Sequence, residues 1–78
     1  MTATEKKLIE IICNYQKISP ENIDPESNLM QDLSLSSFDV INIVCKIEEE
    51  FDVEISERQL MKLRTVKSFA TLVDDLQE

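Results

Sequence analysis

The chain has 78 residues, 42% of them hydrophobic and 31% charged, and it contains neither Gly nor His. At this length we expect one domain spanning residues 1–78, with little room for a large enclosed active site. The formal net charge of −8 disfavours nucleic acids and membranes as partners, and the lack of His removes the commonest general base and metal ligand, so we predict no catalytic residues and no metal site.

The first predicted element is an amphipathic helix over residues 4–16. Its apolar side chains recur at helical spacing: Leu8, Ile11, Ile12 and Tyr15. Two residue pairs are spaced to frame its start, Thr2 with Glu5 or Thr4 with Lys7.

Residues 17–35 are predicted to form a long loop. Pro20 and Pro25 stop the first helix from continuing, and the stretch sustains no apolar period. Single apolar residues are nevertheless spaced along it and predict a loop that is ordered against the core: Ile18, Ile23, Leu29 and Leu33. Because the chain has no Gly, we expect Asn or Asp wherever a turn requires a positive φ.

The second predicted helix begins at Ser37 and carries two sets of apolar residues. One set faces the core: Val40, Ile43, Val44, Ile47 and Phe51. The other set lies on a neighbouring face, and periodicity alone allows it to be buried or exposed: Phe38, Ile41 and Cys45.

Ser36 is the predicted N-cap of this helix. Asp39 follows three residues later, as a capping-box partner does, and apolar residues occupy both staple positions, Leu35 and Val40. Ser37 then takes the first helical position, exposed beside the unpaired amide groups at the positive end of the helix. A phosphate on Ser37 would lie in a favourable field, although a serine at a helix start is usually an ordinary surface residue.

Two more helices complete the predicted fold. A short one is expected around residues 57–61, where Ser56 to Gln59 have capping-box form, and an amphipathic one follows Thr65. The fold class is therefore all-α, a small four-helix bundle of three longer helices and one short helix, with a long loop between the first two. The predicted core is Leu8, Ile12, Ile23, Leu29, Val40, Val44, Ile47, Ile55, Val66, Phe69 and Val73.

The cysteines and the missing targeting signals suggest a compartment. Cys13 and Cys45 each lie alone in an apolar-periodic segment without CxxC spacing, which predicts two reduced thiols. No basic stretch precedes an apolar run near the N-terminus, and no apolar segment is long enough to span a membrane. We therefore expect a cytoplasmic monomer.

Around its serines the sequence resembles the acyl carrier protein family. That family opens its second helix with an Asp-Ser-Leu triplet, preceded by a Leu-Gly pair and followed by an amphipathic run that ends in acidic residues and Phe. Here the stretch DLSLSSFD, residues 32–39, aligns with the first part, and IEEEF, residues 47–51, aligns with the sequel. Residues 23–29 and Thr65-Val66 match as well, so the resemblance covers nearly the whole chain.

Three residues depart from the family pattern. Ser36 replaces an Asp; it still caps a helix but removes a charge next to the attachment site. Phe38 replaces a Leu and enlarges the apolar residue. Ser34 replaces a Gly, where a positive φ would strain a residue that has a Cβ.

The resemblance implies a carrier and not an enzyme. A phosphopantetheinyl transferase would attach the 4'-phosphopantetheine arm of coenzyme A to Ser37, and the thiol of the arm would hold acyl chains as thioesters for fatty-acid or related biosynthetic enzymes. The carrier interpretation also predicts an exposed strip, rimmed by acids, that meets basic docking patches on these enzymes: Phe38, Asp39, Ile41, Cys45, Glu48 and Glu49. Candidate residues to shelter an acyl chain between the helices are Val40, Ile43, Ile47, Leu63 and Phe69.

Three other functions stay open. A specialised carrier for polyketide, aminoacyl or peptide assembly would share the fold and Ser37 but load a different group. A non-carrier acidic interaction module would lack the prosthetic group, and the acids of residues 48–54 would then be an ordinary solvated helix end. A hydrolase with Ser37 as nucleophile would need a base that the sequence does not supply.

Overall fold

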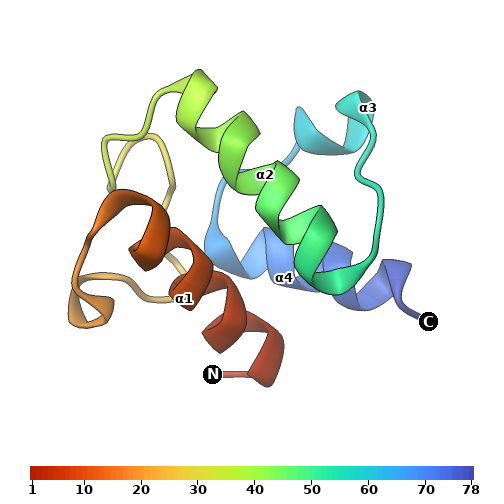
Figure 1. Cartoon of the computed structure of the whole chain (residues 1–78), viewed down its shortest axis with the longest axis horizontal. Helices are drawn as coiled ribbons and strands as arrows, with labels where there is room; N and C mark the ends of the chain where they lie inside the picture. Colours follow the sequence, from red (N-terminus) through yellow and green to blue (C-terminus); the bar gives the residue numbers. More distant parts are fainter.

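The computed structural model describes all 78 residues and contains only helices, turns and loops around one core. The helices are α1 (Ala3–Gln16), α2 (Ser37–Phe51), α3 (Glu57–Leu60) and α4 (Val66–Leu76), and a 3₁₀ turn, η1 (Pro20–Asn22), lies in the first loop. Helix α1 contacts both α2 and α4, while the loop and α3 lie on opposite sides in Figure 1. The predicted all-α fold of three longer helices and one short helix is confirmed.

Every α-helix begins at a complete capping box. In each, the N-cap side chain accepts a hydrogen bond from the third helical amide, and the side chain of that third residue accepts one from the backbone amide of the N-cap: Thr2 with Glu5, Ser36 with Asp39, Ser56 with Gln59 and Thr65 with Ser68. Of the two residue pairs predicted to frame the start of α1, Thr2 with Glu5 forms the capping box. Ser36 is the N-cap of α2, as predicted. These starts are encoded locally, within four consecutive residues.

The long loop is ordered, as predicted, because hydrogen bonds tie it to the start of α4. The Leu29 amide donates to the Arg64 carbonyl at 3.0 Å, and the Val66 amide donates to the Ser27 carbonyl at 3.2 Å. Around Leu29, Asn28 forms a bridge with Thr65. Buried Ile23 and Leu29 anchor the loop from inside, so the loop holds a fixed position ahead of α2.

Most of the predicted core is buried, with two corrections. Val40 and Ile55 are only half-buried, because Val40 lines a surface groove and Ile55 lies in the connection between α2 and α3. Sequence reasoning missed Ile9 and Ala70, which are 5% and 3% exposed. Helix α1 buries a broader face than a single stripe because it packs against two helices at once. The remaining additions to the buried core are Cys13, Leu35 and Ile43.

Three residues, none of them glycine, have a positive φ. They are Lys17 at 57°, Ser34 at 57° and Asp52 at 54°. Only Asp52 fits the expectation of Asn or Asp; Lys17 and Ser34 contradict it. Lys17 is the C-cap of α1 and Asp52 the C-cap of α2, positions at which helices commonly end with a residue in the left-handed conformation.

Replacing Ser34 with Gly is expected to stabilise the protein by about 0.5–1 kcal/mol. The left-handed conformation costs a residue with a Cβ about 1–2 kcal/mol, and Gly relieves this strain. Gly also loses more conformational freedom on folding, which reduces the gain in stability by roughly 0.5–1 kcal/mol. The measurement is the free energy of unfolding in urea. Ser19→Gly is the matched control, since Ser19 has a φ of −68° and the same change there should destabilise. A loss of stability in Ser34→Gly would contradict the strain argument.

Candidate functional site

The two serines at the start of α2 have separate roles. The Ser36 hydroxyl accepts from the Asp39 amide at 3.1 Å and donates to Asp39 Oδ2 at 3.0 Å, while the Ser36 amide donates to the same carboxylate oxygen at 2.9 Å. Ser37 is exposed and takes no part in this capping box. Its hydroxyl lies beside the free amides of the first turn, where the helix dipole favours an anion.

Tyr15 links α1 to this first turn. Its hydroxyl donates to Asp39 Oδ1 at 2.9 Å and accepts from Asn42 Nδ2 at 3.2 Å. The helical spacing predicted Tyr15 only as an apolar residue of the first helix, and nothing in the sequence pairs residue 15 with residue 39. The link holds the start of α2 against α1, so the orientation of the helix that presents Ser37 depends on a contact between helices.

The carboxylate of Asp39 is held ionised by its donors. The Ser36 backbone amide, then the Tyr15 hydroxyl and the Ser36 hydroxyl, lower the pKa of Asp39 below its ordinary value. We predicted Asp39 as a docking residue; in the structure its side chain is half-buried and bonded within the protein. Any contact with a partner enzyme would be made by a carboxylate that already stabilises the helix start.

This arrangement predicts a dependence of stability on pH. A carboxyl group with a lowered folded pKa stabilises the native state above its unfolded pKa of about 3.9, and the contribution is lost as pH falls through the folded value. Asp39→Asn should therefore be less stable than wild type at pH 7, and the difference should shrink below about pH 4. Urea unfolding from pH 2.5 to 7 would measure it. Tyr15→Phe, which removes one donor, should lose part of the same contribution; a difference independent of pH would contradict it.

A groove between α2, the long loop and the segment from α3 to α4 includes Ser37 among its lining residues. It has a volume of about 190 Å³, and most of its lining residues are apolar: Met30, Ser37, Val40, Ile41, Leu60, Leu63 and Arg64. We call it the Ser37 groove. Val40 and Leu63 were predicted to line a shelter for an acyl chain, and both line this groove.

The other three candidates for that shelter, Ile43, Ile47 and Phe69, do not line the groove. They lie in the closed core, with exposed fractions of 0%, 1% and 2%. The sequence gives no signal for the true lining, because Met30, α2 and the segment after α3 come together only in the folded chain. Apolar side chains at helical spacing look the same whether they face a core or a groove.

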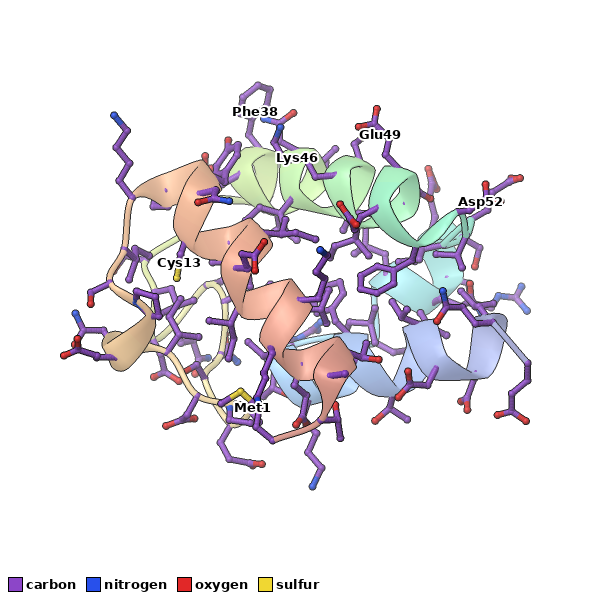
Figure 2. All side chains as sticks on the ribbon, turned by 60° about the horizontal axis from the view of Figure 1, so that its bottom comes forward. Met1, Cys13, Phe38, Lys46, Glu49 and Asp52 are labelled. Atoms are coloured by element: carbon purple, nitrogen blue, oxygen red, sulfur yellow. The ribbon has the colours of Figure 1, made fainter.

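The apolar strip on α2 is exposed, which settles the question that periodicity left open. Phe38 is 71% exposed and Ile41 53%, and Cys45 is exposed with a free thiol. We call these three residues the α2 strip. Figure 2 shows Phe38 and Glu49 both projecting away from the body of the protein along α2. Met30, 47% exposed, lines the same groove as Ile41 and widens the apolar surface beside the strip.

The acidic residues at the end of α2 differ in their surroundings. Glu48 Oε2 accepts from the Ile55 amide at 2.8 Å and so holds the connection to α3. Glu50 pairs with Lys7 across to α1 at 3.5 Å, an exposed pair that contributes little stability. Glu49 is exposed. Of the two glutamates predicted to meet a partner, Glu48 thus has a structural role as well.

Other features of the molecule offer less to a ligand. A larger hollow of about 390 Å³ between α1 and α2 is lined mainly by polar residues, among them Asn14 and Lys46, and does not include Ser37. Burial raises the pKa of the Cys13 thiol, which keeps it protonated and unreactive. None of the helices combines the length and apolar character needed to cross a membrane.

Comparisons with known proteins agree with this geometry. The chain matches the family described as "Phosphopantetheine attachment site" over residues 6–73. It is 40% identical over 67 residues to the acyl carrier protein of Syntrophobacter fumaroxidans, covering 86% of this chain and 83% of that one. The acyl carrier protein of Buchnera aphidicola subsp. Schizaphis graminum is also 40% identical over 67 residues, covering 86% and 85%. The structure is similar to one from Mycobacterium tuberculosis assigned as an acyl carrier protein, with a TM-score of 0.86 and 26% identity over 94% and 97% of the two chains.

Proposed function

Because the chain belongs to the acyl carrier protein family and carries acyl groups on a covalently bound 4'-phosphopantetheine arm, we propose that Ser37 is the residue to which the arm is attached. One observation carries this assignment. The hydroxyl of Ser36 is committed to the capping box of α2, whereas Ser37 is exposed and lines an apolar groove.

The residues around Ser37 fit such a group. A phosphodiester on Ser37 would lie at the amino end of α2, where the helix dipole stabilises an anion by about 0.3–1 kcal/mol. Apolar residues, among them Val40 and Ile41, line the same groove as Ser37. Once attached, the arm supplies the thiol that holds acyl groups as thioesters. The protein itself presents the hydroxyl, the helix end and the groove, and we propose that it catalyses no step.

We further propose that the α2 strip and Glu49 form the surface that meets acyl-processing enzymes. Exposed Phe38 and Ile41 offer apolar contact, and Glu49 with the net charge of −8 favours enzymes whose docking patches are basic. Such association weakens as the salt concentration rises, because screening shortens the reach of the charges. A salt-independent rate of loading by a transferase would count against this docking surface.

The test of the attachment site is mass spectrometry. The protein is incubated with coenzyme A and a broad-specificity phosphopantetheinyl transferase, and its intact mass is measured before and after. We expect one added phosphopantetheine, and fragmentation of the peptide that holds both serines should place it on Ser37. An arm on Ser36, or no added mass in a well-folded sample, would overturn the assignment.

The pathway served is a separate proposal. Fatty-acid or related acyl synthesis is the leading one, and a specialised carrier for polyketide, aminoacyl or peptide assembly is the alternative, favoured by bulky Phe38 and by Ser36 at the contact surface. Incubating the holo protein with an acyl-transferring, an aminoacyl-adenylating and a malonyl-transferring enzyme would separate them, since each loads the arm with a group of different mass.

A further inference from the structure

Arg64 is the one charged residue in the wall of the Ser37 groove. Its side chain is exposed, and one guanidinium nitrogen, Nη1, donates to the carbonyl oxygens of Met61 at 2.8 Å and Leu63 at 2.9 Å. The single ion pair of the protein joins Lys7 and Glu50, so the Arg64 guanidinium has no carboxylate partner. In a chain with sixteen acidic residues and eight basic ones, an arginine in this position has spare donors and no counter-charge.

The backbone of Arg64 is held in place from two directions. Its carbonyl accepts from the Leu29 amide at 3.0 Å, and its amide donates to Ser68 Oγ at 3.2 Å. The loop before α2 and the first turn of α4 therefore both position this residue. With two carbonyls also holding Nη1, the guanidinium loses less side-chain freedom on binding an anion than a freely moving surface arginine would.

The carboxylate nearest to Ser37 in sequence is already occupied. Asp39 receives hydrogen bonds from the Ser36 amide, the Ser36 hydroxyl and the Tyr15 hydroxyl. It does not pair with Arg64, which leaves the guanidinium available to a negative group that enters the groove.

We propose that Arg64 binds the phosphate of the arm on Ser37 and so positions the arm along the groove. The proposal rests on the attachment of phosphopantetheine at Ser37. A phosphodiester keeps its negative charge at neutral pH, and the planar guanidinium is suited to paired hydrogen bonds with phosphate oxygens. Held by Arg64, the first part of the arm lies over the apolar wall formed by Val40 and Ile41 instead of extending into solvent.

Nuclear magnetic resonance tests this directly, because the chain has only two arginines, Arg58 and Arg64. In ¹⁵N-labelled protein, loading of the arm should shift the Nε–H signal of Arg64 and slow its hydrogen exchange about two- to fivefold at low salt, the size expected of an exposed ion pair. The Arg58 signal, from α3 outside the groove, should not change. The ³¹P signal of the arm should move in Arg64→Gln but not in Arg58→Gln, which loses the same charge.

A purely structural role for Arg64 gives a different pattern. If Arg64 only caps the carbonyls after α3, Arg64→Gln lowers the melting temperature equally in apo and holo protein, and the ³¹P signal keeps its wild-type position in both Arg64→Gln and Arg64→Lys. If Arg64 binds phosphate, Arg64→Gln lowers the melting temperature more in the holo protein than in the apo protein. The ³¹P signal of Arg64→Lys then lies closer to its wild-type position than that of Arg64→Gln. Fragmentation of the peptide that carries the arm, in the same samples, separates the two proposals: an arm at Ser37 with an unmoved Arg64 signal overturns only the role of Arg64, whereas an arm elsewhere overturns both.

Discussion

Replacing Ser37 with Ala is expected to abolish attachment of the arm, while the same change at Ser36 is expected to leave one arm per chain. The difference follows from the hydrogen bonds at the start of α2. Ser36 forms the capping box with Asp39, whereas the hydroxyl of Ser37 is exposed and is free to react. A transferase needs an accessible hydroxyl, and only Ser37 offers one without breaking the helix start.

The variant that keeps the arm should be the less stable of the two. Ser36→Ala removes an N-cap and should lower the free energy of unfolding by about 1 kcal/mol. Ser37→Ala removes an exposed hydroxyl and should stay within about 0.5 kcal/mol of wild type. Intact mass after transferase treatment and urea unfolding of both variants measure the two effects. An arm that persists in Ser37→Ala, or a Ser36→Ala variant that is both stable and unmodified, would move the site to Ser36.

Replacing Phe69 with Ala is expected to lower the free energy of unfolding by about 3–5 kcal/mol. Phe69 is 2% exposed on α4 and belongs to the core cluster, and truncating a buried Phe costs about 3–5 kcal/mol. A domain of this length has a stability of about 4–12 kcal/mol, so the loss removes much of the total. Circular dichroism and urea unfolding would report it.

Phe38→Ala is the matched control for this prediction. It makes the same chemical change at a side chain that is 71% exposed, and we expect a change of no more than about 0.5 kcal/mol. The pair also tests whether the core is closed. If Phe69→Ala lost less than about 1 kcal/mol, far below a core truncation, the interior around Phe69 would be loosely packed and could open toward an acyl chain, contrary to the structure.

The start of α2 shows what short-range information is enough to predict. The roles of Ser36 and Asp39 were predicted because a capping box joins residues three apart, and Ser37 follows from it as the first helical residue. The faces of α1, α2 and α4 were predicted in the same way, since residues three and four apart share a side of a helix. The exposure of Phe38 was not decided by periodicity; it required the resemblance to carriers as an additional premise.

The groove and its neighbours show what local information does not contain. Arg64 and Ser37 are 27 residues apart in sequence, counted from their numbers, yet both line one groove, and the loop before α2 is tied to Arg64 by the hydrogen bond from the Leu29 amide to the Arg64 carbonyl. Tyr15 and Asp39 likewise pair across two helices.

By itself, the sequence determined the four helices, their caps, the ordered loop and the serine that we propose for the arm, because capping and helical periodicity act between residues a few positions apart. Only the tertiary structure decided the left-handed conformations of Lys17 and Ser34, the half-buried position of Val40, the closed core at Ile43 and the place of Arg64 in the groove that Ser37 lines. Each of these depends on which distant segment packs against the residue, and a strained or half-exposed residue is stable only when those neighbours hold it there.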